Sequence, residues 1–136
     1  MLHGKPGTGK SYLISALHNS LGGKCVLTAM TAFAANNIGG DTVHSALSPP
    51  AFQKQGSAWP PLKPDKLQEK QKLFEGKHLL VIDEISMCSS MTFEQLFKRL
   101  EEIKPENQGI VVLVVGDFAQ LPPVNSGSLC KRGFSN

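Results

Sequence analysis

Apolar residues in this chain follow two patterns that alternate along its length. Short continuous runs have the length of buried strands, and they cover Cys25–Thr28, His78–Ile82 and Ile110–Val115. Apolar positions at helical spacing fill Leu13–Leu21, Thr31–Ile38, Asp65–Phe74 and Met91–Ile103, with Asp65 expected to cap its helix. Strands that alternate with helices predict an α/β fold with a doubly wound, mainly parallel sheet.

Glycine and proline mark where this pattern breaks. Gly39–Asp41 ends the second predicted helix, and Ser48–Pro64 holds five prolines, which predicts an exposed loop without regular structure. At 136 residues the chain has the length of one domain. We expect that domain to cover residues 1–125, with Met1–His3 as the remnant of an incomplete first strand. Residues 126–136 are expected to be a tail or a truncated linker to further domains.

The most specific motif lies immediately before the first predicted helix. Gly4–Ser11 matches G-x-x-x-x-G-K-[ST], the phosphate-binding loop of nucleoside triphosphatases. Glycines let several backbone N–H groups face one phosphate, Lys10 adds a positive charge, and the Ser11 hydroxyl is a ligand for Mg²⁺. The alternative is a glycine-rich turn that matches by chance. The residues expected to bind the nucleotide are Gly4, Pro6, Gly7, Thr8, Gly9, Lys10 and Ser11.

Two acids follow the second continuous run. Asp83 would hold Mg²⁺ together with Ser11, and Glu84 would orient and deprotonate the water that attacks the γ-phosphate. In a parallel sheet, the carboxyl ends of the strands gather at one edge, so these acids and the phosphate loop should lie together. The alternative is that both acids cap a helix starting at Ile85.

A third polar segment, Gly116–Pro123, follows the last run. The amide of Gln120, held beside two prolines, is suited to sensing a γ-phosphate. Glycine and proline also favour a plain turn at this place, and by physical reasoning alone the two interpretations are equally good.

Composition narrows the class of protein. Apolar residues make up 40% and charged residues 18%, which is ordinary for a soluble globular protein, and no apolar run approaches the ~20 residues that span a bilayer. We therefore expect no membrane partner. Cys25, Cys88 and Cys130 lie far apart without metal-type spacing, which favours a reducing intracellular setting.

The net charge of +3 comes largely from one stretch. Six of the fourteen basic residues lie between Lys54 and Lys77, together with three acids. Such a stretch could contact a polyanion, or it could be the solvated face of a helix. Both interpretations stay open here.

The motifs as a set resemble superfamily-one helicases, most closely the petite-integration-frequency family of 5′→3′ DNA helicases, which includes the helicases of Helitron-type transposons. The resemblance runs in the family's order across nearly the whole chain. It rests on Gly4–Ser11, Thr28–Ala35, Asn37–Ser45, Val81–Met87 and Gly116–Val124.

The resemblance implies a RecA-like motor domain that binds ATP and Mg²⁺. It makes Lys10, Glu84 and Gln120 the catalytic positions, with Ser11 and Asp83 at the metal. It implies that Thr28, Thr31 and His44 contact single-stranded DNA, although a Thr-Ala-Met-Thr segment is more often a strand end and helix cap. The implied partners are single-stranded DNA and duplex junctions.

The resemblance also implies parts that this sequence lacks, above all a second RecA-like domain that supplies an arginine to the transition state. The chain alone is therefore expected to be inactive as a helicase. A natural fragment, a partial gene and a pseudogene product all fit. A helicase implies the nucleus or mitochondrion of a eukaryote, or the cytoplasm in a bacterial or viral setting. Two alternatives are a protein-remodelling ATPase and a nucleotide-binding remnant without catalysis.

Overall fold

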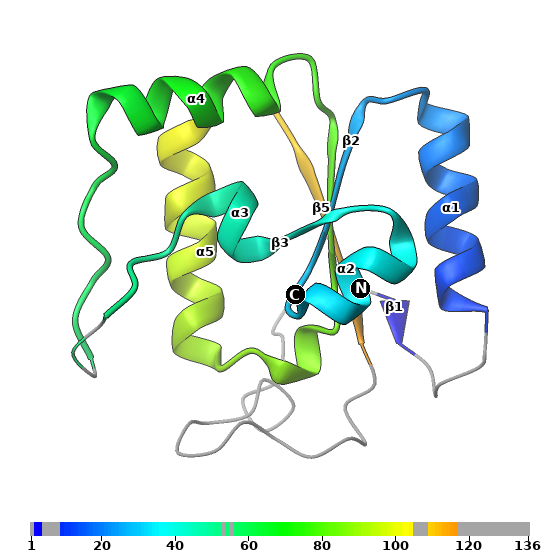
Figure 1. The fold of residues 1–136 in the computed structure, drawn as a ribbon, viewed down its shortest axis with the longest axis horizontal. Helices are drawn as coiled ribbons and strands as arrows, with labels where there is room; N and C mark the ends of the chain where they lie inside the picture. The colour runs from blue at the N-terminus through cyan, green and yellow to red at the C-terminus, as the bar shows by residue number, and fades with distance from the viewer. Residues whose placement is uncertain (1, 4–8, 53, 55, 105–108, 117–136) are drawn as a thin grey trace.

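The computed structural model describes residues 2–3, 9–52, 54, 56–104 and 109–116. Within these residues, five parallel strands form one sheet in the order β1-β5-β4-β2-β3, and five α-helices and one 3-10 helix (η1) connect or cover them (Figure 1). This arrangement confirms the predicted α/β fold. In chain order the elements are β1 (Leu2–His3), α1 (Lys10–Leu21), β2 (Cys25–Ala29), α2 (Ala32–Ile38), β3 (Asp41–Thr42), α3 (Val43–Leu47), α4 (Pro64–Phe74), β4 (Leu79–Asp83), η1 (Ile85–Met87), α5 (Ser90–Ile103) and β5 (Val111–Gly116).

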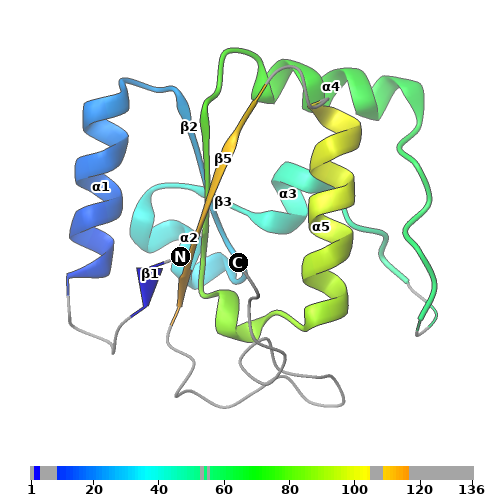
Figure 2. The same ribbon diagram turned by 180° about the vertical axis from the view of Figure 1, so that it is seen from behind.

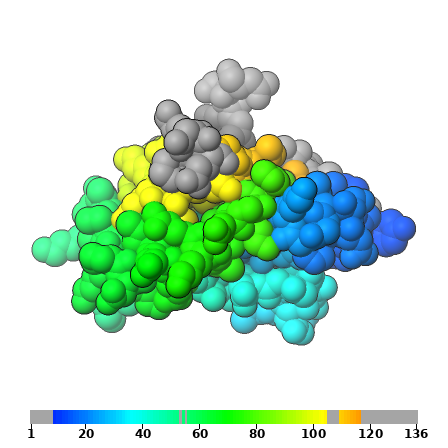
Figure 3. Space-filling model, turned by 90° about the horizontal axis from the view of Figure 1, so that it is seen from above, coloured from blue at the N-terminus to red at the C-terminus, as the bar shows by residue number. Residues whose placement is uncertain are grey.

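Helices cover both faces of the sheet because its strands are apolar on both sides. Side chains alternate along β4, so that Leu79 and Val81 pack with α1 and α2, whereas Leu80 and Ile82 pack with α3, α4 and α5. Figures 1 and 2 show α1 on one side of the sheet and α4 and α5 on the other. From above, α4 and α1 lie at opposite sides of the molecule (Figure 3). The fold is doubly wound, as predicted.

The strand register brings the carboxyl ends of the central strands to one edge. Ala29 at the end of β2 pairs with Asp83 at the end of β4, and Ile82 pairs with Val114 near the end of β5. The N-terminus of α1 lies on the same side of the sheet (Figure 1). This edge is therefore where polar groups from separate segments meet.

Helix boundaries follow local capping. The hydroxyls of Thr31 and Ser89 accept hydrogen bonds from the N–H groups of Ala34 and Thr92, which starts α2 and α5. The prediction that Asp65 caps the fourth helix was wrong: Lys63 is the cap and Pro64 is the first helical residue. Proline has no N–H group to satisfy at that position.

The break predicted at Gly39–Asp41 is real, but it is followed by structure that the pattern did not predict. Gly39 ends α2 in the left-handed conformation, and a Cβ on Gly40 would overlap the carbonyl of Leu27. That close approach lays β3 against β2, and α3 follows directly. Two strand residues and a five-residue helix are too short for a periodicity argument.

The proline-rich segment has no regular structure over its described residues before Pro64, which begins α4, and part of the segment is fixed to α5. We call residues 57–62 the strap. Backbone N–H groups of Trp59 and Leu62 donate to the side chains of Gln95 and Glu102 at 3.0 and 2.7 Å. Arg99 donates to the carbonyl of Pro60 at 2.9 Å. Side chains of α5 thus provide hydrogen-bond partners for backbone groups of a segment whose prolines prevent regular backbone hydrogen bonding.

None of the described helices has both the length and the apolar character needed to cross a bilayer.

Candidate active site

The N-terminus of α1 lies at the carboxyl edge of the sheet (Figure 1). Gly9 precedes the helix at φ 83°, a conformation that L side chains rarely adopt, and no side chain caps the helix. The first N–H groups of a helix lack intrahelical partners and carry the positive end of its dipole, so they attract an anion. Lys10 is half-buried and Ser11 is exposed in this first turn. Gly4, Pro6, Gly7 and Thr8 lie outside the described residues.

Asp83 ends β4 as a nearly buried carboxylate, 9% exposed. Burial raises the pKa of Asp83, while the hydrogen bond from the N–H of Glu84 (2.8 Å) and the charge of Lys10 act in the opposite direction. The charge of Lys10 thus acts on Asp83 although the two residues are far apart in sequence. A buried carboxylate with a shifted pKa fits a site for charged ligands.

Glu84 has an unusual backbone. Its φ of 58° and ψ of 38° place a non-glycine residue in the left-handed region, which costs of order 1–3 kcal/mol where the surroundings impose it. Its side chain makes no capping hydrogen bond to η1, so the alternative in which the acids cap the next helix fails for Glu84. The half-buried side chain is thereby left for another role.

The end of β5 packs directly against η1. A Cβ on Gly116 would lie 2.9 Å from Cγ2 of Ile85 and 3.2 Å from the N atom of Ser86, so only glycine fits without a shift. The last residue of β5 therefore lies beside the segment that follows the two acids. Gln120 lies outside the described residues, and its sensing role stays a prediction.

The two threonines expected to hold DNA have different environments. Thr28 is fully buried and its hydroxyl donates to the carbonyl of Val81 at 2.6 Å, so the predicted DNA contact by its side chain was wrong. This hydrogen bond replaces the bonds to water that the buried hydroxyl of Thr28 has lost. Thr31 is half-buried and caps α2, with its hydroxyl accepting from Ala34 at 3.1 Å. That bond leaves the hydroxyl proton of Thr31 available to donate.

His44 is exposed on α3, beyond the carboxyl ends of β2 and β3. Thr42 caps α3 by accepting a hydrogen bond from the N–H of Ser45 at 3.1 Å. The cap fixes the start of the short helix that carries His44. The structure therefore leaves His44 and Thr31 as the DNA-contact candidates with accessible polar atoms.

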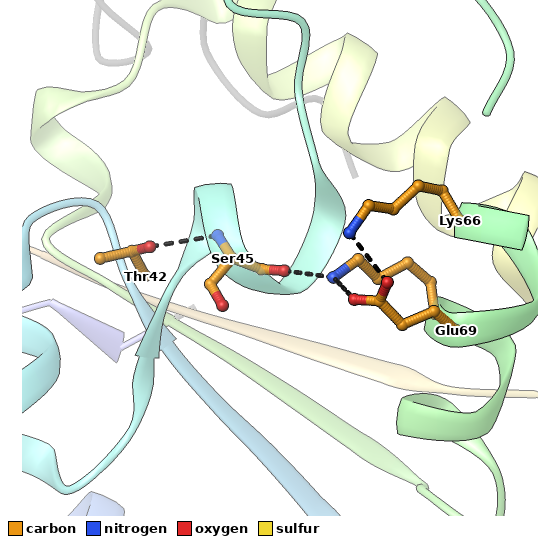
Figure 4. A network of polar contacts seen from close by, with 5 residues as sticks. Thr42, Ser45, Lys66 and Glu69 are labelled. Atoms are coloured by element: carbon orange, nitrogen blue, oxygen red, sulfur yellow. Dashed lines mark hydrogen bonds and ion pairs between the residues drawn. The ribbon is translucent and has the colours of Figure 1, made fainter. Parts of the chain in front are cut away.

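Lys70 holds α3 in place from α4. Its buried ammonium group donates to the carbonyl of Ser45 at 2.6 Å and to Glu69 at 3.0 Å, and Lys66 pairs with Glu69 at 2.8 Å (Figure 4). Hydrogen bonds from Lys66 and Lys70 lower the pKa of Glu69. Lys70 is thus a structural residue within the basic stretch, and neither of the two interpretations of that stretch described it.

A family model decides the relationship of this chain to known proteins. The model described as PIF1-like helicase matches residues 1–133. The chain belongs to the PIF1-like helicase family. It is 39% identical over 133 residues to the human ATP-dependent DNA helicase PIF1, and 36% identical over 138 residues to the protein of that name from Saccharomyces cerevisiae. These alignments cover 92% and 90% of this chain and 20% and 15% of the relatives, so it spans about a fifth or less of their length.

Solved PIF1-like structures share the fold. The crystal structure of Bacteroides Pif1 bound to single-stranded DNA matches with a TM-score of 0.73 and 31% identity over 92% of this chain and 30% of that one. The Bacteroides Pif1 complex with ADP-AlF3 and single-stranded DNA also matches with a TM-score of 0.73, at 30% identity over 92% and 29% of the two chains. The sheet and helices described above are thus those of a PIF1-like RecA domain.

Sequence reasoning missed residues that position the PIF1-like site without carrying its chemistry. Gly40 and Gly116 permit close backbone approaches, and Lys70 and Arg99 hold α3 and the strap. For Gly40 and Gly116, the sequence did offer a signal, because a glycine within a turn or at a strand end often marks a close backbone approach. The partners of the two buried cations lie 25 and 39 residues away, and only the fold brings them together.

Proposed function

We propose that this chain is the ATP-binding motor domain of an ATP-dependent 5′→3′ DNA helicase, in which ATP hydrolysis drives movement along single-stranded DNA and duplex unwinding. The observation that supports the proposal is that the N-terminus of α1, which carries Lys10, lies on the same side of a PIF1-like sheet as the end of β4, where Asp83 and Glu84 follow one another (Figure 1). The solved relative with ADP-AlF3 and single-stranded DNA supports it, because that protein binds both ligands.

In this proposal the loop at Gly4, Pro6, Gly7, Thr8 and Gly9 wraps the phosphates, and Lys10 neutralises their charge. Helix α1 contributes its N-terminal N–H groups and carries no acid in its first turn that would repel an anion.

The residues present fit Mg²⁺. The ion prefers oxygen ligands and usually takes one or two protein ligands besides water and phosphate, which the Ser11 hydroxyl and the Asp83 carboxylate would supply. Burial raises the pKa of Asp83 because the carboxylate loses contact with water. A bound cation would offset that cost. When bound, Mg²⁺ would neutralise charge that develops on the phosphates.

Glu84 would accept the proton of the attacking water. Gln120 would read the γ-phosphate from the segment after β5. Thr31 and His44 would contact single-stranded DNA, with duplex junctions as the further substrate. A second RecA-like domain would complete the ATP site. Such a protein would work where DNA is, in the nucleus or mitochondrion of a eukaryote or the cytoplasm of a bacterium.

The test is the affinity of the chain for Mg²⁺-ATP after Lys10→Ala. Loss of one charge-assisted contact to phosphate removes about 1.5–3 kcal/mol, so the dissociation constant for a fluorescent ATP analogue should rise about 10- to 150-fold.

Lys24→Ala is the matched control, because Lys24 is an exposed lysine near the opposite end of α1 and should leave the affinity unchanged. Equal affinities of wild type and Lys10→Ala would show that the nucleotide site has been assigned to the wrong residues.

A further inference from the structure

A hollow of about 390 Å³ lies beside the two acids, on the face of the sheet that carries α3 and α5. It is distinct from the nucleotide site, since it opens between α3, η1, the start of α5 and the strap. Buried side chains of Val43 and Leu96 lie at its inner end. Its other walls include Met30, His44, Pro50, Trp59, Met87 and Thr92.

The lining is uncharged. None of the described residues around the hollow is lysine, arginine, aspartate or glutamate, and burial raises the pKa of the Cys88 thiol to about 12, so it stays protonated. The described lining residues thus offer no lysine or arginine side chain to a phosphate group. Flat indole, imidazole and proline surfaces and two thioethers instead suit a planar, neutral ring.

The indole of Trp59 is fixed in advance. Its backbone N–H donates to Gln95, and the guanidinium of Arg99 lies 5.8 Å from the ring centroid while it donates to the carbonyl of Pro60. A wall that is already ordered loses little entropy when a ligand binds.

The hollow is also joined to the acids by backbone hydrogen bonds. The N–H of Met30 donates to the carbonyl of Asp83, and the N–H of Met87 donates to the carbonyl of Glu84, both at 3.1 Å. A ligand that contacts the two methionines would therefore touch residues whose backbone is hydrogen-bonded to that of the two acids proposed to act on ATP.

We propose that this hollow receives one unstacked nucleobase of single-stranded DNA. The inference rests on the proposed function, and it adds base contact to the phosphate contacts expected of Thr31 and His44. Proteins that grip single strands without reading sequence commonly stack bases on aromatic and apolar side chains. The hydroxyls of Ser89 and Thr92, which bond to each other at 2.8 Å, supply the polar part of the lining.

The test compares two labelled strands of equal length by fluorescence anisotropy, oligothymidylate and an abasic deoxyribose-phosphate strand. Stacking of one base is worth about 1–3 kcal/mol, so the wild-type chain should bind oligothymidylate about tenfold more tightly. Met87→Ala should reduce this preference at least about threefold and leave the affinity for the abasic strand unchanged.

Met87 is 49% exposed, so its truncation should not unfold the chain, and thermal unfolding verifies this. Met91→Ala is the matched control, a 39% exposed methionine on α5 outside the hollow, and it should keep the full preference. A strand carrying 5-iodouracil should also cross-link to Trp59 or His44 on irradiation.

Three results would overturn the base site. Equal wild-type affinity for both strands, or equal weakening of both by Met87→Ala, rejects it while DNA binding by the chain stands. Cross-links confined to residues outside the hollow reject it as well. Binding of neither strand by the wild-type chain rejects the base site and the DNA part of the proposed function together.

Discussion

Asp83 is held where its charge is costly. Because burial raises the pKa of Asp83 in the folded state, the folded chain binds a proton more readily at this residue than the unfolded chain does. The stability that Asp83 contributes is therefore fully present below its unfolded pKa of about 4. It is lost as the pH rises through the pKa that Asp83 has in the folded chain. For stability alone, an uncharged side chain would be better than a carboxylate at position 83.

We accordingly expect Asp83→Asn to raise the melting temperature at pH 7. The asparagine oxygen can still accept the hydrogen bond from Glu84, while the desolvated charge is gone. The advantage should vanish near pH 3, where aspartate is protonated as well. Thermal unfolding from pH 3 to 8 measures this.

Asp65→Asn is the control for the pH series, since Asp65 is exposed in the first turn of α4, where a negative charge is favourable. A melting temperature of Asp83→Asn below that of wild type at pH 7 would contradict the interpretation.

Thr28 provides the opposite case, a polar residue that serves the fold. Thr28→Val keeps the shape but removes the donor to Val81, so it should lower the free energy of unfolding by about 1 kcal/mol. Its affinity for single-stranded DNA should equal that of wild type, because the buried side chain is out of reach. Urea denaturation and anisotropy measure the two quantities, and weaker DNA binding by the folded variant would restore Thr28 as a contact.

At the scale of elements, α5 serves both the core and the strap. Its apolar side enters the core through Leu96, Leu100 and Ile103, while Gln95, Arg99 and Glu102 hold residues 57–62. The periodicity of Met91–Ile103 predicted the helix and its apolar side. It could not show that Arg99 is buried, because arginine at an interface position looks like any solvated residue.

Arg99→Ala should release the strap. The change removes the donor to Pro60, the cation over Trp59 and the partner of Glu102, and we expect a loss of about 2 kcal/mol in unfolding free energy. Trp59 is the sole tryptophan of the chain, so its emission should shift to longer wavelength in the native state.

Arg99→Lys should recover only part of the loss, since lysine lacks the planar fork that reaches two acceptors. Lys98→Ala, at the exposed neighbouring position, should leave emission and stability as in wild type. Unchanged emission of Arg99→Ala would mean that the strap is held by other contacts.

At the scale of the whole molecule, the placement of the N-terminus of α1 and the end of β4 on one side of the sheet (Figure 1) was predictable because parallel topology brings strand ends to one edge. Three strands followed from continuous apolar runs and most helices from apolar periodicity, because each of these elements is long enough to show its pattern. What escaped prediction depends on single close approaches, such as Gly40 on Leu27, or on buried cations such as Lys70. Their partners are set by the assembled fold and leave no local pattern.

The contact between Gly116 and η1 has a mechanical consequence. A Cβ on Gly116 would overlap atoms of Ile85 and Ser86, so the junction has no room for a side chain, and packed interiors resist compression. We therefore expect a movement of the end of β5 toward η1 to displace η1 as well. Met87 is the last residue of η1 and is half-exposed, so such a movement would change the position of a side chain at the surface.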